Sequence, residues 1–343
     1  MIAVTAGDPC GIGPEVILKA LDRLPAPLHR RLLIIGDEAV FQRTARRLGR
    51  RPPRWREVQL SSSLSTASDC RLSIVDCRLS GGKIVNRKSS FENFQPAFLH
   101  VRPPGAAHAG RASLAYLEHA LLLWRAGRIG ALVTGPVTKW AIQRVRPGFV
   151  GQTEYLAQAL GGCDVVMMFV SDRLRIALLT RHLPLRRVAG ALTQDVLERS
   201  LRLTVQALRC SFRIARPKLA LCGLNPHAGE AAPDSEERRV MQPILRALRR
   251  QGLVCEGPFA ADGFFASDAV RAYDAIVCAY HDQGLIPFKM AARDRGCQFS
   301  AGLPLIRTSP DHGSALDIAG RGIAECGSMA YAIRLAARLS ARR

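Results

Sequence analysis

The chain has 343 residues, of which 48% are hydrophobic and 22% are charged, and it carries a formal net charge of +21. This length and composition are typical of a globular protein of one or two domains, and no apolar run reaches the roughly 18 to 20 residues that a membrane-spanning helix needs. The first residues lack the basic and apolar regions of a secretory signal, so we expect a cytoplasmic protein.

Short apolar runs alternate along the chain with amphipathic segments of helical length, which is typical of an α/β protein with a largely parallel sheet. Strands are predicted, in chain order, at 2–5, 32–36, 131–135, 165–170, 219–223 and 275–280. Helices are predicted at 13–23, 37–48, 113–127, 193–210, 236–250 and 326–340. The stretch from about 50 to 110 is rich in Ser, Pro, Gly and Arg, and we interpret it as loops with room for a hairpin.

Three histidines lie in polar segments that follow apolar ones, namely His182, His227 and His281. Neutral imidazole is the commonest metal ligand in proteins, and three of them with one open position form a familiar catalytic arrangement. Their separations, 227 − 182 = 45 and 281 − 227 = 54 residues, match no metal-binding motif. Taken alone, each histidine is therefore interpreted as an ordinary surface or hydrogen-bonded residue.

Several predicted strands end directly in polar segments, which is where open α/β sheets bind their ligands, and other polar residues of the chain are further candidates. Asp262 and Asp282 could bind a metal, orient a histidine or accept a proton, and they could equally cap turns. Arg307 could bind phosphate or carboxylate through two hydrogen bonds, and Lys289 could add a point charge. The segment 7–15, GDPCGIGPE, permits a tight turn but does not have the spacing of a Rossmann dinucleotide fingerprint.

The excess of basic residues is also typical of a different class of protein, a nucleic-acid-binding protein on an α/β scaffold. The arginines are spread over the whole length, however, which favours a solvated basic surface that also attracts an anionic substrate. The ten cysteines are scattered without a dense framework, and we expect them to be reduced.

Eight segments, taken together and in order, resemble the signature segments of the 4-hydroxythreonine-4-phosphate dehydrogenase family of vitamin B6 biosynthesis. They are GDPCGIGPE, TGPVTK, GQTEYLA, HLPLR, CGLNPHAGE, GPFAADGFF, YHDQGLIPFK and GLPLIRTSPDHGSALDIAGRG. The resemblance covers about residues 2 to 335 and is weak between about 50 and 105. Eight ordered motifs are far more specific than any one of them.

The resemblance implies a fold like that of isocitrate and isopropylmalate dehydrogenases, with two α/β/α lobes and a cleft between them. We expect a discontinuous cofactor-side lobe, 1–130 plus 290–343, and a lobe at 131–289 that carries metal, substrate and dimerisation surfaces. The resemblance also implies a homodimer with shared active sites, NAD or NADP as cofactor and a divalent metal, Zn, Mg or Co. Nucleic acid and membranes are not expected as partners.

The resemblance assigns roles residue by residue. It implies that His182, His227 and His281 are the metal ligands and that Asp262 and Asp282 are catalytic residues beside them. The implied substrate-binding residues are Gln152, Thr153, Lys289, Gln298 and Arg307. The loop HGSALDIAG would hold the adenosine part of the cofactor through His312, Gly313, Asp317 and Gly320.

Two positions depart from the family pattern. Gln152 stands where the family has histidine, and Gln298 stands where it has asparagine. Glutamine donates and accepts hydrogen bonds but cannot shuttle a proton.

The first expectation is oxidation of 4-phosphooxy-L-threonine at C3 with decarboxylation to 3-amino-2-oxopropyl phosphate. The two glutamines favour an alternative substrate, threonate or erythronate 4-phosphate. The three histidines, Lys289 and Arg307 argue against a non-catalytic relative.

Overall fold

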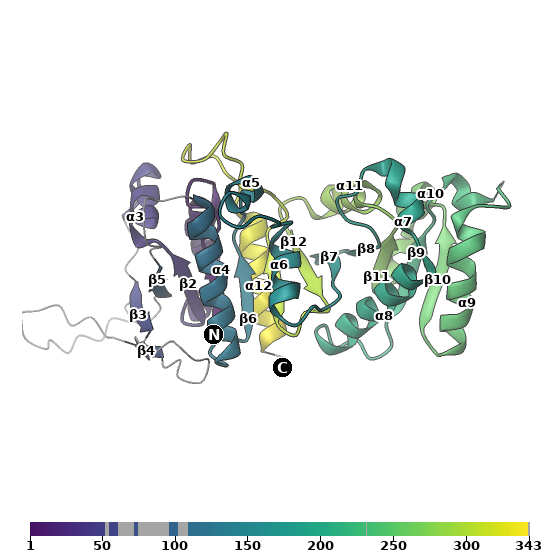
Figure 1. Ribbon diagram of the computed structural model, residues 1–343, viewed down its shortest axis with the longest axis horizontal. Coiled ribbons are helices and arrows are strands. Elements are labelled where there is room, and N and C mark those ends of the chain that lie inside the picture. Colours follow the sequence, from purple (N-terminus) through teal and green to yellow (C-terminus); the bar gives the residue numbers. More distant parts are fainter. Residues whose placement is uncertain (52–54, 61–71, 75–95, 102–108, 231, 342–343) are drawn as a thin grey trace, which may run out of the picture. The chain divides into compact units, whose positions relative to one another are not determined.

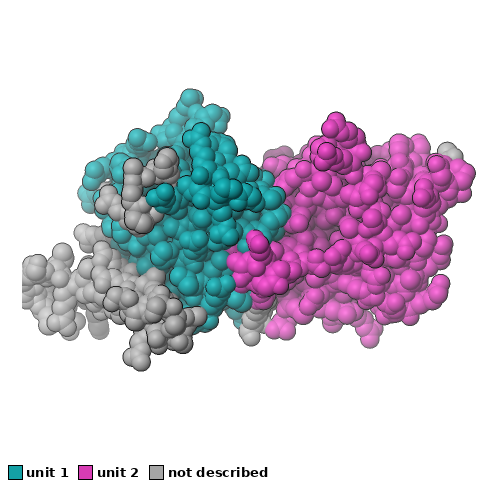
Figure 2. Space-filling view, viewed as in Figure 1, with its two compact units in different colours: residues 1–155, 305–341 teal, residues 156–304, 342–343 magenta. Residues whose placement is uncertain are grey.

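The computed structural model describes residues 1–51, 55–60, 72–74, 96–101, 109–230 and 232–341. The chain forms two compact units, which Figure 2 colours separately: residues 1–155 with 305–341 are unit 1, and residues 156–304 are unit 2. Both units combine helices with a mostly parallel sheet, which confirms the predicted α/β class. The sequence predicted changes of lobe after residues 130 and 289, whereas the units change after residues 155 and 304. The first change comes later because strand β6 (Ala131–Thr134) pairs with β1 (Ile2–Thr5) within unit 1.

Unit 1 is built on a sheet whose central strands are parallel (Figure 1). The residues of these central strands are fully buried. The strand order is β13 (Ile306–Ser309), β6, β1, β2 (Leu32–Gly36), β5 (Ala97–His100), β3 (Arg56–Leu60) and β4 (Leu72–Ile74). Only β4 runs antiparallel to its neighbour β3, and this pair lies where the sequence left room for a hairpin. The residues between these two strands lie outside the described part of the chain.

The helices of unit 1 are α1 (Gly13–Asp22), α2 (Ala26–His29), α3 (Glu38–Arg47), α4 (Ala109–Arg125), α5 (Lys139–Gln143), α6 (Gln152–Ala159), which continues into unit 2, and α12 (Gly327–Ser340). Pro14 near the start of α1 is preorganised for helix, and the side chain of Asp37 caps α3 by accepting from the Ala39 amide. Helix α4 packs on β1, β2 and β6, while α12 packs on β1, β6 and β13. These helices bury the apolar sheet and leave the carboxyl ends of its strands to the loops.

In unit 2 the described strands are hydrogen-bonded to one another in a row. Its strand order is β10 (Val254–Phe259), β9 (Lys218–Cys222), β11 (Ala275–Cys278), β8 (Arg175–Leu178), β7 (Val166–Ser171) and β12 (Gly296–Ala301). The strands from β10 to β8 are parallel, and β7 and β12 are antiparallel to their neighbours. Its α-helices are α7 (Val188–Ala191), α8 (Gln194–Cys210), α9 (Gln242–Arg250), α10 (Ala261–Ala266) and α11 (His281–Ala292).

Short helical turns complete the connections of unit 2. They are η2 (Leu185–Arg187), η3 (Pro226–Gly229), the π-helical turn η4 (Glu237–Met241) and η5 (Asp268–Ala272). No helix within the described residues of either unit is long and apolar enough to span a membrane.

Candidate active site

In unit 1, Arg307 is the centre of a buried polar cluster. Its guanidinium donates to the hydroxyl of Thr134 from Nη2 at 2.6 Å and from Nε at 3.1 Å, and from Nη1 to the hydroxyl of Thr153 at 3.2 Å. Only 4% of Arg307 is exposed, so these contacts fix the orientation of its planar fork. A fork of this kind matches the oxygens of phosphate or carboxylate. The structure thus brings together Arg307 and Thr153, both expected to bind substrate.

Gln152 belongs to the same cluster. Its side-chain oxygen accepts from Nη2 of Arg307 at 3.2 Å, and its amide nitrogen donates to the carbonyl of Gly135 at 2.8 Å. Gln152 is the first residue of α6, so the amide is held at the end of a helix where backbone N–H groups favour anions. The departure from the family histidine therefore leaves a satisfied and buried hydrogen-bonding group.

The loop expected to hold the cofactor packs on other parts of unit 1. The backbone N–H of Ile12 donates to the carbonyl of Ser314 at 2.9 Å, and the Ser314 hydroxyl is hydrogen-bonded to that of Thr138 at 2.8 Å. A methyl group added at Gly320 would come within 3.0 Å of Nη1 of Arg47 on α3. Thus the segments 7–15, 134–139 and 311–324 meet in one region of unit 1.

Within this loop, the expected cofactor residues are partly accessible. His312 is half-buried, and its Nε2 is a buried nitrogen without a hydrogen-bond partner among the described residues. Gly313 and Asp317 are exposed, and Gly320 has φ +77°, a left-handed conformation that favours glycine. These residues share one loop and leave polar atoms available to a ligand.

Glu15 and Lys19 on α1 hold the end of the same loop. The Glu15 carboxylate, 1% exposed, accepts from the backbone N–H groups of Ala324 at 3.0 Å and Gly322 at 3.3 Å. The Lys19 ammonium donates to the carbonyls of the same two residues at 2.9 and 2.6 Å, and to Glu15 at 2.9 Å. One ion pair therefore satisfies two donors and two acceptors of the loop backbone.

In unit 2, the three predicted metal ligands follow the carboxyl ends of neighbouring strands. Strands β8, β11 and β9 are adjacent and parallel, and they precede His182, His281 and His227 respectively. Because such strands end at the same edge of the sheet, the segments that follow them lie side by side. The amide of Gln283 links two of these segments, since it donates to the carbonyl of Gly223 at 2.6 Å and accepts from the N–H of Ala279 at 2.7 Å.

His182 and His281 face one pocket of about 440 Å³. Their ring centroids are 5.9 Å apart. Nδ1 of His281 donates to the carboxylate of Asp282 at 2.7 Å, which favours the tautomer with a lone pair on Nε2. The backbone of His182 is left-handed, with φ 50°.

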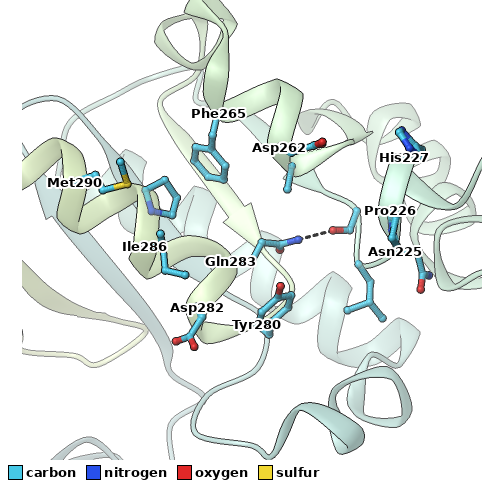
Figure 3. Close-up of a pocket in the computed structure, with 14 residues that line it drawn as sticks. Asn225, Pro226, His227, Asp262, Phe265, Tyr280, Asp282, Gln283, Ile286 and Met290 are labelled. Carbon is cyan, nitrogen blue, oxygen red and sulfur yellow. Dashed lines mark hydrogen bonds between the residues drawn. The ribbon is translucent and has the colours of Figure 1, made fainter.

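His227 and Asp262 line an adjoining pocket of about 610 Å³, which shares Tyr280 and Asp282 with the first (Figure 3). In the part of the chain that the structure describes, no three His, Cys, Asp or Glu side chains are grouped closely enough to hold a metal ion. The pair His182 and His281 is therefore assembled, and His227 is not gathered with it into a set of three.

The donor types nevertheless fit a divalent ion. Two imidazoles bound to one ion at about 2.1 Å have ring centroids about 5 to 6 Å apart, which agrees with the separation of His182 and His281. A carboxylate on the far nitrogen of a histidine ligand is a common supporting contact, and Asp282 makes it to His281. His227 follows the end of the neighbouring strand β9 and is exposed.

Lys289 and Gln298, also expected to bind substrate, line neither of these two pockets. Lys289 is exposed on α11, two turns after His281. Gln298 is buried on β12 and donates to the hydroxyl of Ser300 at 3.0 Å.

Three other polar residues of the two units were not predicted, namely Thr134, Gln283 and Glu237. Thr134 and Gln283 lie within two of the segments that the sequence singled out, TGPVTK and YHDQGLIPFK, and Glu237 carried no signal beyond its charge.

Comparison with known proteins covers both units. A family described as pyridoxal phosphate biosynthetic protein PdxA matches residues 29–336. The 4-hydroxythreonine-4-phosphate dehydrogenase of Thioalkalivibrio sulfidiphilus is 40% identical over 336 residues, which cover 98% of this chain and 95% of that protein. The crystal structure of the 4-hydroxythreonine-4-phosphate dehydrogenase from Klebsiella pneumoniae matches with a TM-score of 0.77 and 30% identity, covering 99% of each chain. A terephthalate 1,2-cis-dihydrodiol dehydrogenase from Burkholderia xenovorans is similar too, with a TM-score of 0.57, 31% identity and coverage of 98% and 96%.

Proposed function

The chain belongs to the family of the pyridoxal phosphate biosynthetic protein PdxA, and we propose that it is a metal-dependent, NAD(P)-linked 4-hydroxythreonine-4-phosphate dehydrogenase. The proposed reaction oxidises 4-phosphooxy-L-threonine at C3 and then releases carbon dioxide to give 3-amino-2-oxopropyl phosphate. The observation that carries the proposal is the placement of three histidines after three adjacent parallel strands, in a chain similar to such dehydrogenases over its whole length.

We assign the phosphate end of the substrate to the cluster around Arg307. The guanidinium is already oriented by Thr134, Thr153 and Gln152, so binding does not require it to be ordered first. Lys289 and Gln298 are assigned to the same substrate by the family resemblance, and their participation stays a prediction. Holding the phosphate fixes where the carbon that loses hydride lies, and such positioning can contribute several kcal/mol to the rate.

We assign a divalent cation, Zn, Mg or Co, to His182, His227 and His281. When bound, such a cation supplies Lewis acidity, which lowers the pKa of a coordinated hydroxyl and stabilises negative charge on its oxygen. Asp282 keeps Nδ1 of His281 protonated and its Nε2 available. Asp262 and Asp282, both exposed in the adjoining pocket, are the proposed acceptors of the hydroxyl proton, directly or through water.

The cofactor is assigned to the loop of His312, Gly313, Asp317 and Gly320. NAD or NADP, when bound there, would supply the acceptor for the hydride that leaves C3, and the β-keto acid so formed would lose carbon dioxide from its carboxylate. The loop has a defined conformation because Glu15 and Lys19 hold its end. Nε2 of His312 has no hydrogen-bond partner among the described residues, which supports the assignment of a ligand to this loop.

We further propose a homodimer whose subunits share active sites. Leu183, Leu185, Ile286 and Met290 are large apolar side chains that line or border the two histidine pockets, with exposures of 41%, 67%, 60% and 76%. Exposed apolar side chains beside a polar site are typical of a surface covered by a partner. The cytoplasmic location expected from the sequence stays a prediction.

The test is the kinetics of cofactor reduction on 4-phosphooxy-L-threonine, with and without added Zn²⁺, Co²⁺ or Mg²⁺. Activity should disappear after chelation and return with a divalent cation, and His281→Ala should lose both cation binding and turnover while still folding. His119→Ala is the matched control, because Nδ1 of His119 contacts only a carbonyl of its own helix α4, Ala115, among the contacts described. Full activity of His281→Ala in chelated buffer would contradict the proposal.

The same assay of cofactor reduction applies to a second class of substrate. Gln152 and Gln298 depart from the family pattern at substrate positions, which favours threonate or erythronate 4-phosphate as the alternative. The terephthalate dihydrodiol dehydrogenase is 31% identical to this chain, and its name specifies a different substrate. A higher kcat/KM on a phosphorylated sugar acid than on the amino acid would select this alternative.

A further inference from the structure

The turn that carries His227 has an unusual backbone. His227, Ala228 and Gly229 have φ values of 52°, 53° and 69°, so three consecutive residues are left-handed. Side chains other than glycine rarely adopt this conformation, because Cβ approaches the following carbonyl oxygen. Such a turn persists only where its surroundings hold it.

Glu237 provides that support. It is fully buried, and its Oε1 accepts from the backbone N–H groups of Leu224 at 2.7 Å and Asn225 at 2.8 Å. Its Oε2 accepts from the side-chain amide of Asn225 at 2.9 Å. Three donors that precede His227 therefore converge on one carboxylate.

The same carboxylate is packed against both ends of the turn. A methyl group added at Gly223 would lie 3.0 Å from Oε1 of Glu237, and one added at Gly229 would lie 2.5 Å from Oε2. Glu237 is also the first residue of the π-helical turn η4, a distortion that is frequent at functional sites. The segment 223–229 thus wraps around a single buried acid.

We infer that Glu237 is a positioning residue that fixes the turn at 224–229 and thereby sets where the imidazole of His227 meets the divalent cation. Glu237 does not touch the cation site itself and acts through Leu224 and Asn225. This inference rests on the proposed function for the identity of the bound group. His227 lines the pocket that adjoins the pocket of His182 and His281, so the conformation of its turn sets where its ring lies relative to that pair.

A carboxylate suits this position better than an amide. It offers acceptors on both oxygens, whereas glutamine would present an N–H₂ donor to one of the three donors already there. Glu237→Gln keeps the volume of the side chain and breaks at least one of the contacts. Glu236→Gln is the matched control, because Glu236 is the adjacent carboxylate and accepts at 2.7 Å from the same Asn225 amide, while among the described residues it makes no hydrogen bond to the backbone of the turn.

The experiment uses the full chain and Co²⁺ as the probe. Calorimetry measures the Kd for Co²⁺, the visible absorption of bound Co²⁺ reports its ligand geometry, and hydrogen exchange of the metal-free protein reports protection of segment 223–229. We expect Glu237→Gln to raise the Kd about 10- to 100-fold, the range for loss of a supporting contact. We also expect it to change the Co²⁺ spectrum and speed exchange in the segment, while Glu236→Gln shifts the Kd less than about 2-fold.

A second variant guards against misfolding. Asn225→Ala removes one donor and keeps the two backbone contacts to Glu237, so it should change the Kd and the exchange in the same direction by less. Faster exchange in Glu237→Gln with an unchanged Kd and spectrum would overturn the inference, because the acid would then serve the fold alone. His227→Ala separates the two proposals: if its Kd and spectrum equal those of the wild type, the proposed ligand set fails, and the role given to Glu237 falls with it.

Discussion

The guanidinium of Arg307 and the side-chain amide of Gln152 are in direct contact, with Nη2 of the arginine donating to Oε1 across 3.2 Å. The nitrogen of the same amide donates to the carbonyl of Gly135. Glutamine therefore accepts and donates at once. A neutral histidine could do so only in one tautomer, and a protonated histidine could only donate.

Restoring the family histidine should make the enzyme sensitive to acid. We expect Gln152→His to fold and to lose kcat/KM in acid, because an imidazolium would face Arg307 without an acceptor to offer; burial and Arg307 both place this loss below the ordinary histidine pKa of about 6.5. The profile of kcat/KM between about pH 5.5 and 8.5 should gain one ionisation that the wild type lacks. Gln158→His, on an exposed position of α6, is the control, and identical profiles of the two variants would contradict this expectation.

Glu237 should contribute stability that disappears in acid. Burial raises its pKa, but hydrogen bonds from Asn225 and Leu224 outweigh burial and hold the pKa below its usual value of 4.5. Folding then favours the ionised form, so the contribution is present above the unfolded-state pKa and is lost as the pH falls through the lower folded-state pKa. We expect Glu237→Gln to cost about 2 kcal/mol at pH 7 and less at about pH 3.5. Urea unfolding at both values measures this, and an equal cost at both would be the contrary result.

Asp282 should tune the cation site with little effect on the fold. Asp282 and His281 have side-chain exposures of 72% and 43%, so their contact adds little to stability. Asp282→Asn should nevertheless raise the Kd for Co²⁺ about 10-fold, because the carboxylate on Nδ1 makes His281 a better ligand. Asp268→Asn removes a similarly exposed carboxylate, paired with Arg271, and should leave the Kd unchanged. Equal Kd values for the two variants would argue against a role for Asp282.

Glu15 should link stability to cofactor binding. Glu15→Gln weakens the contacts that hold Gly322 and Ala324, and we expect it to lower the free energy of unfolding by about 2 kcal/mol. Because the loop of His312 and Gly320 lies just before these residues, KM for the cofactor should rise several-fold while KM for the substrate stays nearly constant. Glu325→Gln, whose carboxylate is 81% exposed, is the control. Parallel changes in both KM values would refute a specific effect on the loop.

The fold could be predicted where apolar runs are continuous. The strands at 2–5 and 32–36 occur at the predicted residues, and the predicted helix at 193–210 begins one residue later. Strands β5, β8, β10, β12 and β13 were not predicted, because their residues mix polar or small side chains with apolar ones. In β13 the sequence IRTS is buried only because Arg307 meets partners inside the protein.

The site could be predicted only in part, for a related reason. Histidines after apolar runs are visible in sequence, and so is an arginine in a Gly-rich segment. The partners of these residues are not visible, because they depend on contacts between distant positions. Thr134 is 173 residues from Arg307, and Gln283 is 60 residues from Gly223. The same holds for Glu237, whose role rests on backbone donors 12 and 13 residues earlier.

The closure of unit 1 by β13 and α12 has a consequence for biosynthesis. Strand β6 pairs with β13 on one side, and α12 covers β1, β6 and β13, yet all of residues 156–304 are translated before these two elements. A nascent chain therefore holds the first 155 residues without the helix that covers β1 and β6 and with the β13 side of β6 unpaired, while residues 156–304 are already synthesised. Bare sheet edges invite pairing with other chains. Unit 2 is thus synthesised in full before unit 1. The risk of aggregation during synthesis is therefore greater for unit 1.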